Sequence, residues 1–122
     1  MTQAHRFLSA GRFATGSVVV GLLEVLDAAI LYAREGVIGP MSYLVGAVQL
    51  IWVVVSVYVL VRIRHRGAKL LALVYIAWVV FTYVLAALGF ISTVIPMPFV
   101  FLGGAFGVVY ALGAAYLGKY RE

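Results

Sequence analysis

Four long apolar runs dominate this chain, and each is long enough to cross a lipid bilayer. A membrane-spanning helix needs about 20 mostly apolar residues, and four segments meet this requirement: Phe13–Ala33, Met41–Val61, Leu70–Ile91 and Phe99–Tyr116. Every backbone group in the hydrocarbon must be hydrogen-bonded within the protein, so such runs form helices. The pattern therefore predicts an all-α fold, with one domain over residues 1–122 that forms an up-down bundle of four transmembrane helices.

The composition supports a membrane location. Of the 122 residues, 66% are hydrophobic and only 11% are charged, whereas soluble domains are about 45–50% apolar. A soluble domain of this size has too much surface to hide the excess. The net charge of +5 does not indicate nucleic-acid binding, because the basic residues flank the apolar runs and do not form a polar face. We expect a multi-pass protein of the cell membrane, with the lipid bilayer as its first partner.

The basic residues predict the orientation of the helices. Arg34 lies on one side of the predicted membrane, and the other eight Lys and Arg residues lie on the opposite side. The positive-inside rule places that basic side, with both termini and the bend Arg62–Lys69, in the cytoplasm. The basic side chains of this bend are expected at the lipid headgroups, where they fix the topology: Arg62, Arg64, Arg66 and Lys69. Binding of anionic lipid is the alternative role for this bend.

Two carboxyl groups stand near the middle of the first run. Glu24 and Asp27 are three residues apart, so they share one face of a helix. A charge at this depth costs at least ~2.5–3.5 kcal/mol on insertion scales, and acidic residues inside membranes are functional candidates by default. No basic residue is predicted at the same depth. We expect one or both carboxyl groups to be protonated when no cation is bound, because two like charges in a low dielectric repel.

The other helices offer polar and aromatic side chains at a similar predicted depth. Carboxylates supply charge, and the faces of Trp and Tyr rings attract cations. The sequence therefore predicts a site for a small cation or a proton, formed by Glu24, Asp27, Gln49, Trp52, Thr82 and Tyr110. Two other interpretations of the acidic pair stay open. It could be protonated and hydrogen-bonded to Tyr110, Thr82 or Gln49 as structural glue, or it could pair with a basic residue of a neighbouring subunit.

Small residues in the fourth run predict a close helix contact. Gly103, Gly107 and Ala111 repeat every four residues, a spacing that lets two helix backbones approach closely in a membrane. The contact could lie within the bundle or between protomers of a homo-oligomer.

The sequence lacks the residue patterns of catalytic and cofactor sites. There is no cysteine, and His5 and His65 are both expected at the cytoplasmic surface. No His/Glu metal spacing and no Gly-rich phosphate loop occurs, and an acidic pair on one helical turn does not form a facing dyad. We expect no enzymatic activity, no cofactor and no metal. Asparagine is also absent; this is a tendency of hyperthermophile proteins, and avoidance of amides in lipid explains it equally well.

The length, the four spans and the glutamate of the first helix, Glu24, resemble those of small multidrug exporters. The loop charge here is one-sided, and the later helices share no motif with that family, so membership is not predicted. The residues favour a small ion- or proton-coupled transporter or channel that uses Glu24 and Asp27. The alternative is a non-catalytic accessory subunit among the other subunits of a larger membrane complex, for example a respiratory one.

Overall fold

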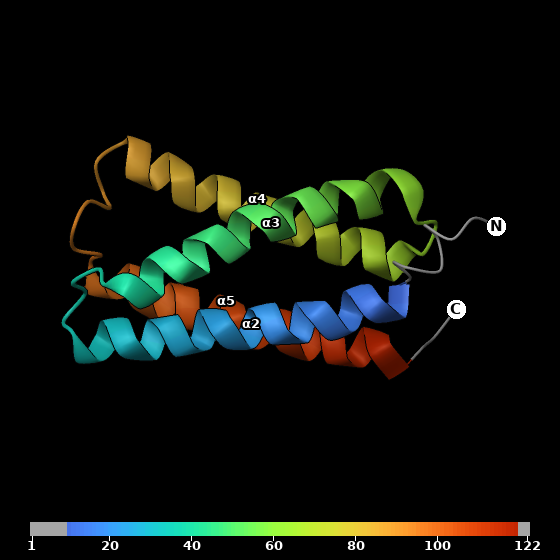
Figure 1. Ribbon diagram of the computed structural model, residues 1–122, viewed down its shortest axis with the longest axis horizontal. Coiled ribbons are helices and arrows are strands. Elements are labelled where there is room, and N and C mark those ends of the chain that lie inside the picture. Colours follow the sequence, from blue (N-terminus) through green and yellow to red (C-terminus); the bar gives the residue numbers. More distant parts are fainter. Residues whose placement is uncertain (1–9, 120–122) are drawn as a thin grey trace.

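The computed structural model describes residues 10–119, which fold into four helices that run alternately up and down (Figure 1). The helices are α2 (Ala10–Ala33), α3 (Pro40–Arg62), α4 (Arg66–Ala87) and α5 (Met97–Lys119). All four are long and apolar enough to span a membrane, because a rise of 1.5 Å per residue carries each beyond the ~30 Å hydrocarbon core. The predicted all-α bundle is confirmed.

The third span begins earlier than the predicted Leu70–Ile91. Helix α4 begins at Arg66, inside the predicted bend Arg62–Lys69, so that only residues 63–65 separate it from α3. The cause is a local cap: Nδ1 of His65 accepts a hydrogen bond from the backbone N–H of Ala68 at 3.2 Å. This bond satisfies one of the N–H groups that a helix start leaves unpaired.

The same helix also ends before the predicted Ile91. Gly89 has a φ of +91°, a left-handed conformation that glycine adopts without steric cost. The turn lets the N–H of Phe90 bond to the carbonyl of Leu85 at 3.0 Å, which is the bond that commonly closes a helix C-terminus. Ile91 therefore belongs to the link between α4 and α5.

The link between α2 and α3 is hydrogen-bonded to the link between α4 and α5. The N–H of Ile38 bonds to the carbonyl of Thr93 at 3.0 Å, and the N–H of Ile95 bonds to the carbonyl of Gly36 at 2.8 Å. Gly36 has a φ of +88°, and a Cβ on it would collide with the carbonyl oxygen of Ile95. Only glycine fits there, so the close approach of the two links depends on it.

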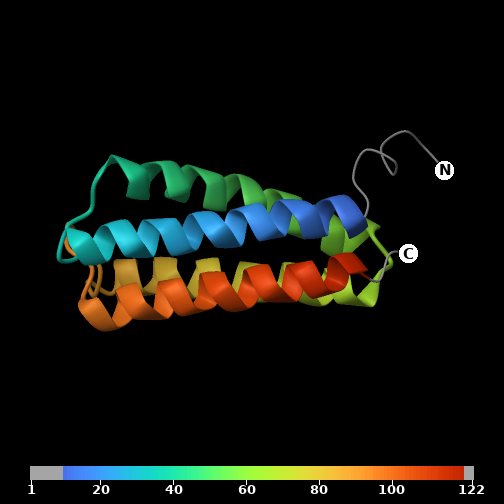
Figure 2. The ribbon, with the colours of Figure 1, turned by 90° about the horizontal axis from the view of Figure 1, so that it is seen from below.

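The helices pack as two pairs, α2 with α5 and α3 with α4 (Figure 1). Figure 2 shows α2 and α5 side by side along their length. A Cβ on Gly107 would lie 2.7 Å from the carbonyl oxygen of Gly21, and a Cβ on Gly21 would lie 2.8 Å from Cβ of Ala111. The backbones of α2 and α5 therefore touch at Gly107 and Ala111, two of the three residues predicted for a close contact.

Gly103, the third of these residues, does not lie in the contact with α2. A Cβ there would meet only Trp78, at 3.8 Å, whereas a Cβ on Gly104 would lie 3.2 Å from Cβ of Ala28. At about 100° per residue, Gly103 and Ala111 stand on opposite sides of Gly107 around the helix. The face that meets α2 turns toward Ala111, so Gly104 takes the expected place of Gly103.

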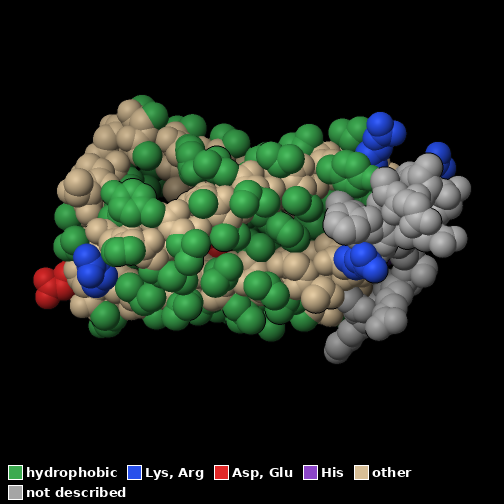
Figure 3. Space-filling model, in the orientation of Figure 1, with side chains coloured by type: hydrophobic (Ala, Val, Ile, Leu, Met, Phe, Trp, Pro, Cys, Tyr) green, Lys and Arg blue, Asp and Glu red, His purple; other side chains and the backbone are tan. Residues whose placement is uncertain are grey.

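The surface is that of a membrane protein. Hydrophobic side chains cover the length of the bundle in Figure 3, and the Lys and Arg side chains seen there lie at its two ends. Large apolar side chains are exposed on all four helices. Except for Arg34, the basic residues of the described part gather at one end of the bundle, around the start of α2, the α3–α4 turn and the end of α5. They are Arg12, Arg62, Arg64, Arg66, Lys69 and Lys119. We call this the basic end. His5, Arg6 and Arg121 lie outside the described residues. The chain is a small multi-pass membrane protein.

Candidate functional site

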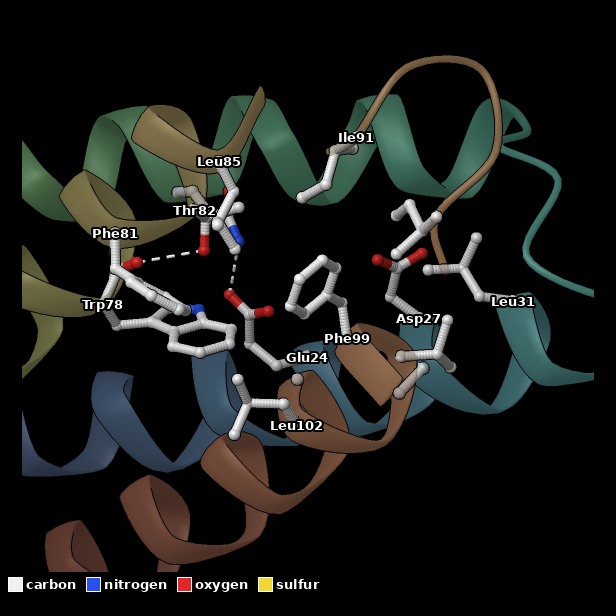
Figure 4. Close-up of a pocket in the computed structure, with 15 residues that line it drawn as sticks. Glu24, Asp27, Leu31, Trp78, Phe81, Thr82, Leu85, Ile91, Phe99 and Leu102 are labelled. Atoms are coloured by element: carbon white, nitrogen blue, oxygen red, sulfur yellow. Dashed lines mark hydrogen bonds between the residues drawn. The ribbon is translucent and has the colours of Figure 1, made fainter. Parts of the chain in front are cut away.

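Helix α2 directs both carboxyl groups into the bundle. Glu24 is 6% exposed, and Asp27, one turn further along, is half-buried. Figure 4 shows both side chains pointing away from α2, toward the elements that carry Thr82 and Ile91. The sequence places the pair on one helical face, and the contact at Gly21 turns that side of α2 inward.

Glu24 is held by donors from two other helices. Nε2 of Gln49, on α3, donates to Oε2 of Glu24 at 2.8 Å, and the hydroxyl of Tyr75, on α4, donates to the same oxygen at 3.4 Å. An oxygen that accepts two hydrogen bonds is a poor position for a proton. A proton on this carboxyl group therefore belongs on Oε1, the oxygen that neither donor uses.

Asp27 has a separate partner. The hydroxyl of Ser42, in the first turn of α3, donates to Oδ1 of Asp27 at 2.9 Å. The two carboxyl groups thus have different hydrogen-bond donors, so each can change its protonation without breaking a shared hydrogen bond. The bonds from Gln49 to Glu24 and from Ser42 to Asp27 both come from α3, and they connect the α2–α5 pair to the α3–α4 pair.

A cavity of about 80 Å³ lies beside the two carboxyl groups (Figure 4). Its polar wall comprises Glu24, Asp27, Gln49 and Thr82, and aromatic and aliphatic side chains form the rest. The volume suits about two or three water molecules, and the polar groups can bind them. Residues of the link between α4 and α5 also line the cavity, so it extends from Glu24 toward the end of the bundle opposite the basic end.

Thr82 and Trp78 both lie in the wall of this cavity. The hydroxyl of Thr82 donates to the backbone carbonyl of Trp78 at 3.0 Å, which leaves its oxygen as an acceptor. The indole Nε1 of Trp78 is buried and has no hydrogen-bond partner among the described residues. The ring of Trp78 stacks on Phe106 with centroids 4.5 Å apart, and this stacking fixes its position.

Trp52 and Tyr110 do not lie beside the carboxyl groups, in contrast to the prediction. Nε1 of Trp52 donates to the hydroxyl of Tyr110 at 3.0 Å, and that hydroxyl also bonds to Oγ of Ser17 at 3.0 Å. Ser17 precedes Glu24 by two helical turns, so this cluster is nearer the basic end. The predicted residues thus divide into a carboxyl layer (Glu24, Asp27, Gln49, Thr82) and an aromatic layer (Trp52, Tyr110).

The aromatic layer closes the interior toward the basic end. Phe13 and Ser17 are fully buried, and Tyr110 is nearly so. Phe13 stacks on Trp52 with centroids 5.3 Å apart and an interplanar angle of 5°. These side chains fill the interior between the carboxyl groups and the basic end, whereas the cavity beside the carboxyl groups extends toward the opposite end.

Tyr75 links the two layers, and it was not among the predicted site residues. Its ring centroid lies 5.1 Å from that of Tyr110, while its hydroxyl reaches Glu24. The available signal was its spacing, because Tyr75, Trp78 and Thr82 recur on one face of a helix. Ser42 and Ser17 were also outside the predicted site, although Ser17 precedes Glu24 and Ser42 precedes Gln49 by seven residues, on the same helical face.

The carboxyl layer offers oxygen ligands and negative charge. Two carboxyl groups, a hydroxyl and an amide converge there, and no Lys or Arg of the described residues lines the cavity. Among the described residues, no group of three or more His, Asp or Glu side chains is placed to hold a metal ion. The layer can hold a proton, or a monovalent cation with few ligands.

Comparison with known proteins adds no assignment. No protein-family model, no curated protein and no solved structure matches this chain.

Proposed function

We propose that this protein is a small transporter that binds a cation at Glu24 and Asp27 in exchange for protons. The observation that carries the proposal is the buried carboxyl group of Glu24 beside a polar cavity. Its Oε2 is occupied by Gln49 and Tyr75. Oε1 is left for either a proton or a cation.

The exchange follows from the charges near Glu24. Asp27 lies on the same helix, Tyr75 faces Glu24 from α4, and Tyr110 of α5 interacts electrostatically with Glu24; the hydrogen-bond donors from α3 are the uncharged Gln49 and Ser42. Two ionised carboxylates in a low dielectric repel, so the empty site favours protons. A bound cation offsets the repulsion and displaces a proton. Cation binding should therefore weaken as the pH falls.

Transport also needs access from the basic end, which the aromatic layer closes. The α2–α5 pair is joined through its backbones, whereas hydrogen bonds of the carboxyl layer connect it to α3 and α4. We expect the two pairs to move against each other when these bonds change. By the positive-inside rule the basic end faces the cytoplasm, so the cavity opens toward the outside.

The test is proton release in proteoliposomes loaded with a pH-sensitive dye, on addition of sodium or potassium chloride. The parent protein should move protons in exchange for one of these ions. Glu24→Gln should abolish the exchange, and Asp27→Asn should weaken it. Glu35→Gln is the matched control, because Glu35 is an exposed acid in the α2–α3 turn. A Glu24→Gln, Asp27→Asn double variant that behaves like the parent would refute the proposal.

A second candidate is a non-catalytic accessory subunit of a larger membrane complex. The observation that favours it is that each carboxyl group already has a donor within the chain, as structural glue requires. Purification in mild detergent followed by mass spectrometry separates the two candidates. Foreign subunits in fixed stoichiometry support the accessory role, and a self-contained oligomer or monomer supports transport.

A further inference from the structure

An apolar groove of about 650 Å³ runs between α4 and α5 near the basic end. Its walls include Leu70 and Val74 of α4 and Val109 and Tyr116 of α5. Gly113 leaves the middle of the groove open, since a Cβ there would meet only Leu71, at 3.9 Å. The groove lies in the membrane-spanning part of both helices, so its occupant is a membrane component.

The groove ends beside basic side chains. Arg66 is one helical turn before Leu70, on the same face of α4, so it stands at the mouth of the groove. Arg66 is exposed, as is Arg64 in the preceding turn, and Lys69 lies in the same first turn of α4. Arg66 thus stands where the apolar groove meets the headgroup region, whereas Lys69 is about 100° or more around α4 from every residue of that helix in the groove wall.

No carboxylate of the described residues balances these cations. Glu24 and Asp27 point into the bundle, and Glu35 lies at the opposite end. An anion that pairs with Arg66 would come from outside the described part of the chain. Phosphate groups of anionic lipids are the abundant anions at this depth, and they attract basic clusters next to membrane helices.

We propose that the groove binds one anionic phospholipid, with an acyl chain between α4 and α5 and the phosphate at Arg66. A single lipid of this class satisfies both the apolar and the basic part of the site. A second copy of the chain fits less well. Inserted in the same orientation, it would bring its own basic end against this one, and the like charges would repel.

The experiment measures retained lipid on the purified full-length protein by native mass spectrometry. The probes are phosphatidylglycerol and phosphatidylcholine with identical acyl chains. The parent should retain one phosphatidylglycerol per chain, with about fivefold preference over phosphatidylcholine, because a basic residue near the surface contributes about 1 kcal/mol. Arg66→Gln should remove the preference. Arg34→Gln, at the opposite end, is the charge control and should leave it unchanged.

A second arm tests the groove itself. Gly113→Leu should fill the groove and release both lipids, and Val109→Phe serves the same purpose if Gly113→Leu does not fold. Gly46→Leu is the matched control, because a Cβ on Gly46 of α3 meets no atom within 4 Å. Equal retention of the two lipids by the parent, or retention that survives a filled groove, overturns the proposal. A filled groove that changes only the oligomeric state also overturns it and identifies a helix-docking surface.

Discussion

The carbonyl oxygen of Gly21 lies against Gly107, so the backbones of α2 and α5 are in direct contact. A Cβ on Gly107 would stand 2.7 Å from that oxygen and 3.0 Å from Cβ of Glu24. Glu24 follows Gly21 by three residues, on the same side of α2. The contact between the two glycines therefore fixes the position of the carboxyl layer relative to α5.

Gly107→Ala should destabilise the bundle by about 1–3 kcal/mol, the usual cost of overpacking a tight contact. The added methyl group meets the backbone of α2, which cannot move aside without separating the helices. Reversible unfolding in detergent, followed by helical circular dichroism, measures the change in the free energy of unfolding.

Gly103→Ala is the control for this variant. Gly103 is one turn away on the same helix, and a Cβ there would lie 3.8 Å from Trp78, an ordinary contact distance. Its stability should stay within about 0.5 kcal/mol of the parent. If both variants lose equal stability, the contact with Gly21 is not what makes Gly107 sensitive.

The helices could be predicted from the sequence because length and hydropathy suffice to define a span. Their ends could not, because they depend on single local bonds. Nδ1 of His65 extends α4 into a charged bend, and Gly89 ends the helix before the apolar run ends. Hydropathy does not report either feature.

The carboxyl layer could be predicted in part. Glu24 and Asp27 were evident from the cost of an acid in lipid, and Gln49 from its polarity. Counting residues from the predicted span ends places Trp52 and Tyr110 at the depth of Glu24, but in the structure Trp52 bonds to Tyr110 and Tyr110 bonds to Ser17, at a level nearer the basic end. Depth along four helices that pack in unequal pairs cannot be counted residue by residue.

Gln49→Leu should weaken cation binding more than Tyr75→Phe does. Both changes remove a donor to Oε2 of Glu24, at 2.8 Å for Gln49 and 3.4 Å for Tyr75. A hydrogen bond to a charged group contributes about 1.5–3 kcal/mol, and the shorter bond should contribute more. Without the donor the ionised carboxylate is less favourable, so more of the sites hold a proton at a given pH.

Binding of sodium or potassium, measured by isothermal titration across a pH series, checks this order. For both variants, half-maximal binding should require a higher pH than for the parent. Thr15→Ala is a suitable control, because its hydroxyl bonds only within α2, to the carbonyl of Gly11. A Gln49→Leu variant with the pH profile of the parent would show that this bond has no influence on proton exchange.

The basic end should face the cytoplasm. Single cysteines at Arg64 and Ser92, both exposed and both in links, can be labelled individually because the chain has no cysteine. In intact cells, an impermeant maleimide should label position 92 and spare position 64 until the cells are opened. Labelling at position 64 alone would reverse the orientation and, with it, the side from which the cavity opens.

Tyr110→Phe should destabilise the aromatic layer and leave the carboxyl layer intact. The hydroxyl of Tyr110 bonds to both Trp52 and Ser17, so its loss leaves the indole N–H of the half-buried Trp52 and the hydroxyl of the buried Ser17 without this partner. An unsatisfied buried group costs about 1–3 kcal/mol.

Ser17→Ala should cost less, because the bond from Trp52 to Tyr110 remains. In detergent unfolding, the double variant should lose less than the sum of the two single variants, since they share one bond. Strict additivity would mean that Ser17 and Tyr110 are not coupled, and that ring packing alone closes the basic end.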